Sequence, residues 1–74
     1  MKIAYYPETD SLYIDLSAAS SVETAEISDG VHLDYDGAGN IVGIDIDGAS
    51  KKLDLRTITL ADFPKTTQVF QNVA

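Results

Sequence analysis

The chain has 74 residues, 45% of them apolar, and its twelve acidic and five basic side chains give a formal net charge of −7. A chain of this length has room for only one hydrophobic core, so we expect one domain over residues 1–74. Its negative field disfavours direct binding to nucleic acids or to anionic membranes. Because cysteine is absent, disulfides and thiolate ligands are excluded, and the core or self-association must stabilise the fold.

The N-terminal sequence MKIAYYPETD passes directly into a strand-like pattern. It lacks the basic leader, apolar core and small-residue cleavage site of a secretory signal. No apolar run approaches the roughly 20 residues that cross a bilayer. We therefore expect a cytoplasmic protein.

Alternation of apolar and polar residues predicts β-strands through the first 47 residues. Residues 2–6 and 12–16 flank a turn in which Pro7 keeps the preceding residue extended and Asp10 supplies turn chemistry. A shift of register by one residue would move every apolar side chain to the other face, so the register is specified. The predicted pairs are Tyr5 with Leu12, Ile3 with Ile14, and Lys2 with Asp15.

Two further hairpins are predicted after the polar link SAASS. Residues 22–27 and 31–36 flank a three-residue loop that ends in Gly30, and residues 41–47 follow a second loop at 37–40. The first of these hairpins predicts the pairs Ile27 with Val31, Ala25 with Leu33, Glu26 with His32, and Thr24 with Asp34. The second predicts Tyr35 with Val42, Leu33 with Ile44, Val31 with Ile46, His32 with Asp45, and Asp34 with Gly43.

All three hairpins place their apolar residues on one face, which predicts an α+β fold built on a five-stranded antiparallel β-meander. That face must be covered by the residues after Gly48 or by a second copy of the chain. We expect a short helix between Ser50 and about Asp62, packed on the apolar face and ended by Pro64. The last ten residues are either a frayed tail or an added edge strand.

The aspartates around residue 40 partly match a calcium-binding loop. Asp34, Asp36 and Gly39 occupy positions one, three and six of an EF-hand loop, and Asp45 occupies position twelve. Ala38 at position five has no side-chain ligand, and the flanking segments are strand-like instead of helical. A turn stabilised by its own aspartates and glycines explains the same residues, so we interpret this segment as a hairpin without a cofactor.

His32 is a second candidate, as a general base, a metal ligand or a pH sensor. The predicted register places it between Glu26 and Asp45, whose charges favour the protonated imidazole. A histidine with two carboxylates is also a common metal-binding set. Since these groups would project from a flat sheet face with no cleft, we interpret them as a solvated charge cluster, with a metal site as the alternative.

No catalytic pattern stands out in the chain. It has a single histidine and no nucleophile elbow, and its glycines at 37, 39 and 43 miss the spacing and the following helix of a dinucleotide site. We therefore predict that the protein is not an enzyme. The apolar residues that we expect to contact a partner are Tyr6, Tyr13, Leu60, Phe63 and Phe70.

Three runs of sequence, taken together, resemble the domain of unknown function 2283 family of small YuzE-like bacterial proteins. They are Y-x-P-E-x-D-x-L-Y-I at 5–14, E-x-x-x-I-x-D-G-V-x-L-D-Y-D at 23–36, and G-x-I-V-G-I-D-I-x-x-A-S-K at 39–51. The resemblance covers about residues 3–56 and leaves 57–74 as a variable segment. It implies a β-meander with a C-terminal helical piece and no established catalytic residue. Some members of that family look like antitoxins encoded beside small basic toxins, so the resemblance implies an antitoxin role as one expectation for this chain.

Three hypotheses for function follow. The first is a noncatalytic acidic binding protein, an antitoxin that masks a small basic toxin. The second is a structural domain that forms a homodimer without a toxin partner. The third is a weak divalent-metal-binding module that uses Asp34, Asp36 and Asp45, or His32 with Glu26 and Asp45.

Overall fold

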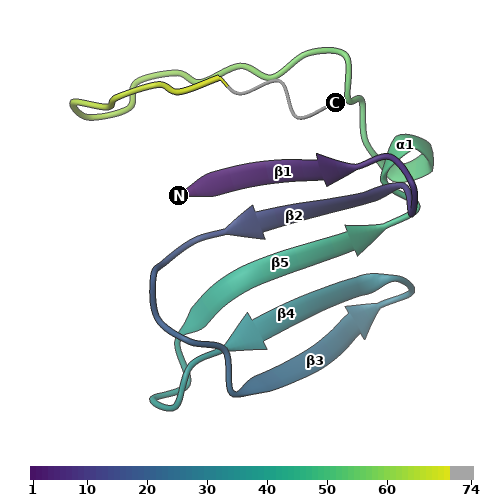
Figure 1. The fold of residues 1–74 in the computed structure, drawn as a ribbon, viewed down its shortest axis with the longest axis vertical. Helices are drawn as coiled ribbons and strands as arrows, with labels where there is room; N and C mark the ends of the chain where they lie inside the picture. The colour runs from purple at the N-terminus through teal and green to yellow at the C-terminus, as the bar shows by residue number, and fades with distance from the viewer. Residues whose placement is uncertain (71–74) are drawn as a thin grey trace.

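The computed structural model describes residues 1–70 and contains one open sheet of five antiparallel strands followed by a short helix (Figure 1). The elements are β1 (Lys2–Tyr6), β2 (Ser11–Asp15), β3 (Glu23–Ser28), β4 (Val31–Tyr35), β5 (Ile41–Asp47) and α1 (Ala49–Lys52). The predicted α+β class and the five antiparallel strands are therefore confirmed. No helix within the described residues has the length and hydrophobicity needed to cross a membrane.

The strand order differs from the predicted meander, because β2 pairs with β5 and not with β3. The order in the sheet is β1-β2-β5-β4-β3, and the link after β2 passes the ends of β5 and β4 to reach the far edge (Figure 1). The β2–β5 pairing aligns Ile14 with Ile44 and Leu12 with Ile46, so these isoleucine and leucine side chains lie side by side in the interior of the sheet. β3, in which Ala25 is the only apolar residue paired on the inward face, takes the edge.

Most of the predicted register is confirmed, with two corrections at β-bulges. Ile27 does not pair with Val31, because Val31 lies opposite Ser28 and the register shifts between Glu26 and Ser28. Tyr35 lies opposite Ile41, so Val42 is the extra residue of the second bulge. Such a bulge places two residues of one strand opposite one residue of its partner, which strict alternation does not anticipate. The confirmed pairs are Tyr5 with Leu12, Ile3 with Ile14, Lys2 with Asp15, Ala25 with Leu33, Glu26 with His32, Thr24 with Asp34, Leu33 with Ile44, Val31 with Ile46, His32 with Asp45, and Asp34 with Gly43.

The apolar face of the sheet is only partly shielded from solvent. We define it by the paired inward residues of the five strands, which are Ile3, Tyr5, Leu12, Ile14, Ala25, Val31, Leu33, Ile44 and Ile46. None of them is fully buried, and among the described residues the buried apolar side chains are Val42, 4% exposed, and Ala49, 0% exposed. The sheet is therefore a single layer.

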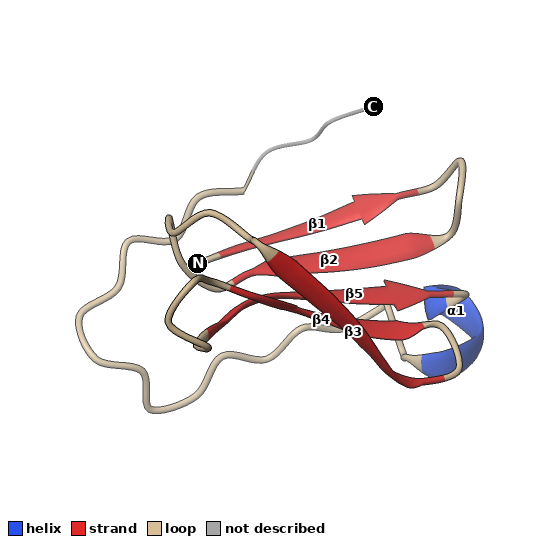
Figure 2. Ribbon diagram, turned by 90° about the horizontal axis from the view of Figure 1, so that it is seen from below, coloured by secondary structure: helices blue, strands red, loops and turns tan. Residues whose placement is uncertain are grey.

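The helix is shorter than predicted and does not pack on the apolar face. It spans four residues, and Leu53 after it is already extended. The β-branched residues 57–59 follow, and such residues lower helix propensity. α1 lies at one end of the sheet (Figure 2), where the N–H of Ala49 donates to the carbonyl of Asp10 at 2.8 Å. The segment after α1 runs outside the β1 edge (Figure 1).

The C-terminal segment forms no added edge strand within the described residues. Residues 53–70 contain neither helix nor strand, and residues 71–74 lie outside the description. Ile58, Leu60, Phe63, Val69 and Phe70 are all exposed. These five side chains are therefore not buried against the apolar face.

Candidate functional site

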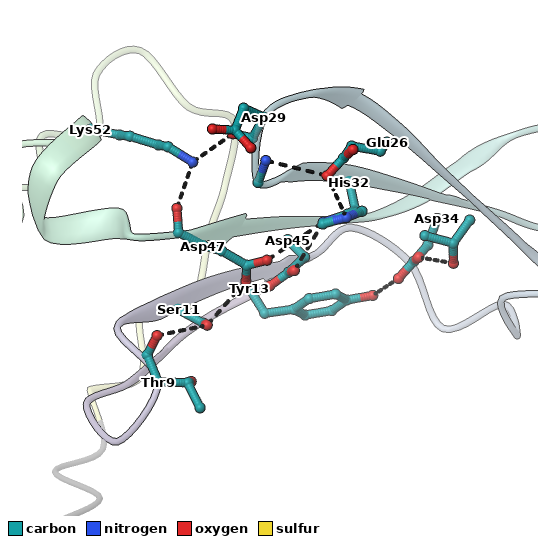
Figure 3. A network of polar contacts seen from close by, with 12 residues as sticks. Thr9, Ser11, Tyr13, Glu26, Asp29, His32, Asp34, Asp45, Asp47 and Lys52 are labelled. Atoms are coloured by element: carbon teal, nitrogen blue, oxygen red, sulfur yellow. Dashed lines mark hydrogen bonds and ion pairs between the residues drawn. The ribbon is translucent and has the colours of Figure 1, made fainter.

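The polar face of the sheet gathers His32 with three carboxylates (Figure 3). His32 Nε2 lies 3.2 Å from Glu26 Oε2, and its Nδ1 lies 3.4 Å from Asp45 Oδ2 and 3.8 Å from Asp47 Oδ2. β4 supplies the histidine and stands between β3, which carries Glu26, and β5, which carries both aspartates. The predicted grouping of His32, Glu26 and Asp45 is thus present. We call these four residues the His32 cluster.

Asp47 is the member of the cluster that the sequence interpretation missed. It lies two residues after Asp45 on the same strand, and side chains at that spacing share a face. That spacing was a usable signal. The β2–β5 pairing places Ser11 opposite Asp47, and the Ser11 hydroxyl donates to Asp47 Oδ1 at 3.1 Å. The other oxygen, Oδ2, is the one nearest to His32.

The electrostatics of the cluster are dominated by negative charge. Partial burial raises the pKa of the Asp45 carboxyl, and the neighbouring Asp47 carboxylate raises this pKa further, while His32 lowers it. Ionisation of Asp45 is therefore less favourable in the folded protein than in an isolated aspartate. Lys52 lies nearby, but its ammonium donates to the main-chain carbonyls of Asp29 and Asp47, at 2.7 Å each, and not to a carboxylate.

Next to the cluster, Tyr13 reaches across β5 to Asp34. The Tyr13 hydroxyl donates to Asp34 Oδ2 at 2.7 Å, and the Thr24 hydroxyl donates to Oδ1 at 2.6 Å. The bond from Thr24, followed by that from Tyr13, lowers the pKa of Asp34. The bond to Asp34, with burial and the same negative charge, raises the pKa of Tyr13 to about 12. Both oxygens of Asp34 are therefore engaged within the sheet.

Asp36 has a local structural role in the loop between β4 and β5. Its Oδ1 accepts hydrogen bonds from the N–H groups of Ala38 and Asn40, both at 2.9 Å. The Asn40 amide also donates to Oδ2 at 3.3 Å, and these bonds lower the pKa of Asp36. This is the aspartate-stabilised turn that the hairpin interpretation predicts.

Among the described residues, only part of the His32 cluster brings three metal-ligand atoms close to one another. Within residues 1–70, the one grouping of three ligand residues with mutually close donor atoms is His32, Asp45 and Asp47, whose atoms lie within 4.8 Å of one another. Asp34 and Asp36, the other metal candidates from the sequence, are not part of it. A surface hollow lined by residues 50–56 includes no member of the cluster.

Comparison with known proteins identifies the family. A family model described as "Protein of unknown function (DUF2283)" matches residues 2–50. The chain belongs to the DUF2283 family. No curated protein and no solved structure matches the chain.

The DUF2283 match covers all five strands and ends at the start of α1. The predicted membership is confirmed, with a matched region that begins one residue earlier and ends six residues earlier than the expected 3–56. The His32 cluster and Ser11 lie inside the DUF2283 region, whereas the second half of α1 and the exposed C-terminal segment lie outside it.

The predicted partner-contact residues are dispersed in this DUF2283 protein. Tyr6 on β1 is half exposed, while Tyr13 is engaged with Asp34 and belongs to no open patch. Leu60, Phe63 and Phe70 are exposed along the C-terminal segment. On the apolar face of the sheet, Ile3 and Tyr5 are exposed and the remaining residues are half-buried.

Proposed function

We propose that this DUF2283 protein is a noncatalytic binding domain that docks a protein partner against the apolar face of its sheet. The observation that carries the proposal is the incomplete burial of that face. Only Val42 and Ala49 are buried apolar residues in the described part of the chain. An apolar surface that spans five strands is costly in water, and large exposed patches of this kind mark interaction sites.

The charge of the chain favours a small basic protein as the partner. The net charge is −7, and exposed acidic residues such as Glu8, Asp29 and Asp54 lie in the turns and links outside the strands. Charges around an apolar interface accelerate association with a partner of opposite charge and select against partners of the same charge. A cytoplasmic antitoxin that masks a basic toxin fits both the apolar face and the acidic surface.

A binding titration with a designed variant tests this function. The probe is a small basic protein encoded by a neighbouring gene, produced separately, and the absence of any such gene would contradict the proposal. Ile3→Asp places a charge on the apolar face at an edge residue that is already 44% exposed, so the free chain should still fold. We expect at least a tenfold loss of affinity, because a carboxylate would be desolvated in the interface.

Ser20→Asp is the matched control, since it adds the same charge to the exposed link between β2 and β3. It should leave the affinity within about twofold of the wild type. Circular dichroism of each variant verifies the fold. Equal binding by the wild type and Ile3→Asp, or no binding of the basic protein at all, would contradict the proposal.

Self-association is the second candidate, and the placement of the charges favours it. The His32 cluster lies on the face opposite to the apolar residues, so two copies could join their apolar faces while their clusters point outward. Light scattering of the isolated protein should then report a dimer that Ile3→Asp dissociates. A monomer at every concentration would eliminate this alternative and leave the basic partner.

A further inference from the structure

We infer that His32, Asp45 and Asp47 form a binding site for a divalent transition-metal cation, with Zn²⁺ as the best fit. The site lies on the polar face of the sheet and does not depend on the partner proposed above. His32 Nδ1 would be the nitrogen ligand, and Oδ2 of each aspartate would be an oxygen ligand. Glu26 and Ser11 would hold these ligands in position.

The distances between the ligand atoms suit a tetrahedral metal. Zinc binds imidazole nitrogen and carboxylate oxygen at about 2.0–2.2 Å, which places neighbouring ligand atoms of a tetrahedron about 3.4 Å apart. His32 Nδ1 lies 3.4 Å from Asp45 Oδ2 and 3.8 Å from Asp47 Oδ2. The two histidine-to-aspartate distances therefore need to change by only a few tenths of an ångström, and all three ligand atoms lie within 4.8 Å of one another.

The free nitrogen of His32 is the observation that points to a ligand. Nδ1 is a buried atom with no hydrogen-bond partner among the described residues. A buried polar atom without a partner is costly, and such atoms are rare in native structures. It faces two carboxylate oxygens without a hydrogen bond to either. A cation between the three atoms would supply the missing interaction.

The contacts around the three ligands orient them as in known metal sites. Glu26 Oε2 lies 3.2 Å from His32 Nε2, so the carboxylate can hold the proton on Nε2 and leave the Nδ1 lone pair for a metal. Ser11 donates to Asp47 Oδ1 at 3.1 Å, which leaves Oδ2 facing the histidine. All three ligands stand on adjacent strands in the middle of the sheet, which limits their movement.

The local charge also favours a cation. Glu26, Asp45 and Asp47 surround one imidazole, and even a protonated His32 would leave an excess of negative charge. A divalent ion would offset the repulsion between the two aspartates. The side chains of His32 and Asp45 are 29% and 31% exposed, so water can reach the remaining coordination position.

The ligand set discriminates between metals. Calcium takes six to eight oxygen ligands, whereas one imidazole with two carboxylates suits zinc. We therefore expect zinc to bind at least tenfold more tightly than calcium. Manganese should lie below zinc, in accordance with the usual order of divalent affinities.

Calorimetry of the full chain with zinc chloride and calcium chloride, in a buffer that does not chelate metals, is the first test. The wild type should bind one zinc ion per chain. His32→Gln, Asp45→Asn and Asp47→Asn should each lower zinc affinity at least tenfold, and Glu26→Gln should lower it by about 10–100-fold by releasing the imidazole.

Asp36→Asn is the matched control, because it removes one acid from the neighbouring loop and leaves the cluster intact. It should change zinc affinity less than twofold. Equal losses in Asp36→Asn and Asp45→Asn would mean that zinc binds through general surface charge, which would overturn the site. The absence of zinc binding to the wild type would also overturn it and would leave a cluster of ion pairs.

The ¹⁵N NMR signals of the imidazole provide a readout that charge alone does not reproduce. The chain has one histidine, so both ring nitrogens are assigned without ambiguity. Zinc should shift the Nδ1 signal and leave Nε2 as the protonated nitrogen. A shift at Nε2 instead, or unchanged signals in excess zinc, would refute the proposed coordination.

Discussion

Replacement of Gly43 with alanine probes how β5 accommodates the Tyr13 ring. Gly43 lies between Asp15 on β2 and Asp34 on β4, and the Tyr13 ring crosses over it to reach Asp34 (Figure 3). A Cβ at residue 43 would lie 2.7 Å from Tyr13 Cζ, closer still to the hydroxyl, and 3.3 Å from Asp34 Oδ2. The ring would have to leave its position.

The expected change in stability has two opposing contributions. A hydrogen bond to a charged group is worth about 1.5–3 kcal/mol, toward the lower end here because both groups are partly exposed. Alanine in place of glycine within a strand stabilises the fold by about 0.5–1 kcal/mol, because alanine loses less backbone entropy on folding. We therefore expect Gly43→Ala to lower the free energy of unfolding by about 1 kcal/mol, from these two contributions.

Urea unfolding measures the stability, and the NMR signals of the Tyr13 ring during alkaline titration report its ionisation separately from the other three tyrosines. In the wild type the pKa of Tyr13 is about 12, and in Gly43→Ala it should move toward the usual 10.0 because the bond to Asp34 is lost. An equal or higher stability together with an unchanged Tyr13 pKa would refute the reasoning. In a Tyr13→Val background, which has no ring to displace, Gly43→Ala should be neutral or stabilising.

Two further predictions concern Asp34 and Lys52. Because hydrogen bonds hold the pKa of Asp34 below 3.8, its contribution to stability is present above the unfolded-state pKa and is lost as the pH falls through the folded-state pKa. Asp34→Asn should therefore be destabilising at pH 7. Its difference from the wild type in urea midpoints should shrink as the pH falls below 3.8, and a difference that grows on acidification would contradict this sign. Lys52→Met should lower the free energy of unfolding by about 1 kcal/mol, because it removes the bonds to the carbonyls of Asp29 and Asp47. Lys51→Met, also on α1, is the control and should be nearly neutral in the same assay.

The corrections to the sequence interpretation share a pattern. Every predicted pair in the β1–β2 hairpin is present, since Pro7, Asp10 and the alternating residues act over a few positions. The errors occur where alternation is interrupted, at the bulges of Ile27 and Val42, and where a pairing is distant in sequence. The helix was overestimated because its stability depended on packing against the sheet, which the structure does not show.

In the candidate site, too, contacts within the hairpins were predictable and contacts between distant strands were not. His32, Glu26 and Asp45 meet through consecutive hairpins, and the sequence predicts their proximity. The Ser11 contact that orients Asp47 requires β2 beside β5. The same pairing brings Tyr13 across Gly43 to Asp34.

By itself, the sequence determined that this chain is an antiparallel β-protein with one apolar and one polar face, because period-two patterning and turn residues are local properties. It also determined family membership and most of the hairpin register. Only the tertiary structure decided the strand order, the completed His32 cluster and the exposure of the apolar face. These three features depend on which strands, distant in sequence, pair with the lowest free energy. That free energy depends on the whole sheet, so it cannot be read from any short segment of sequence.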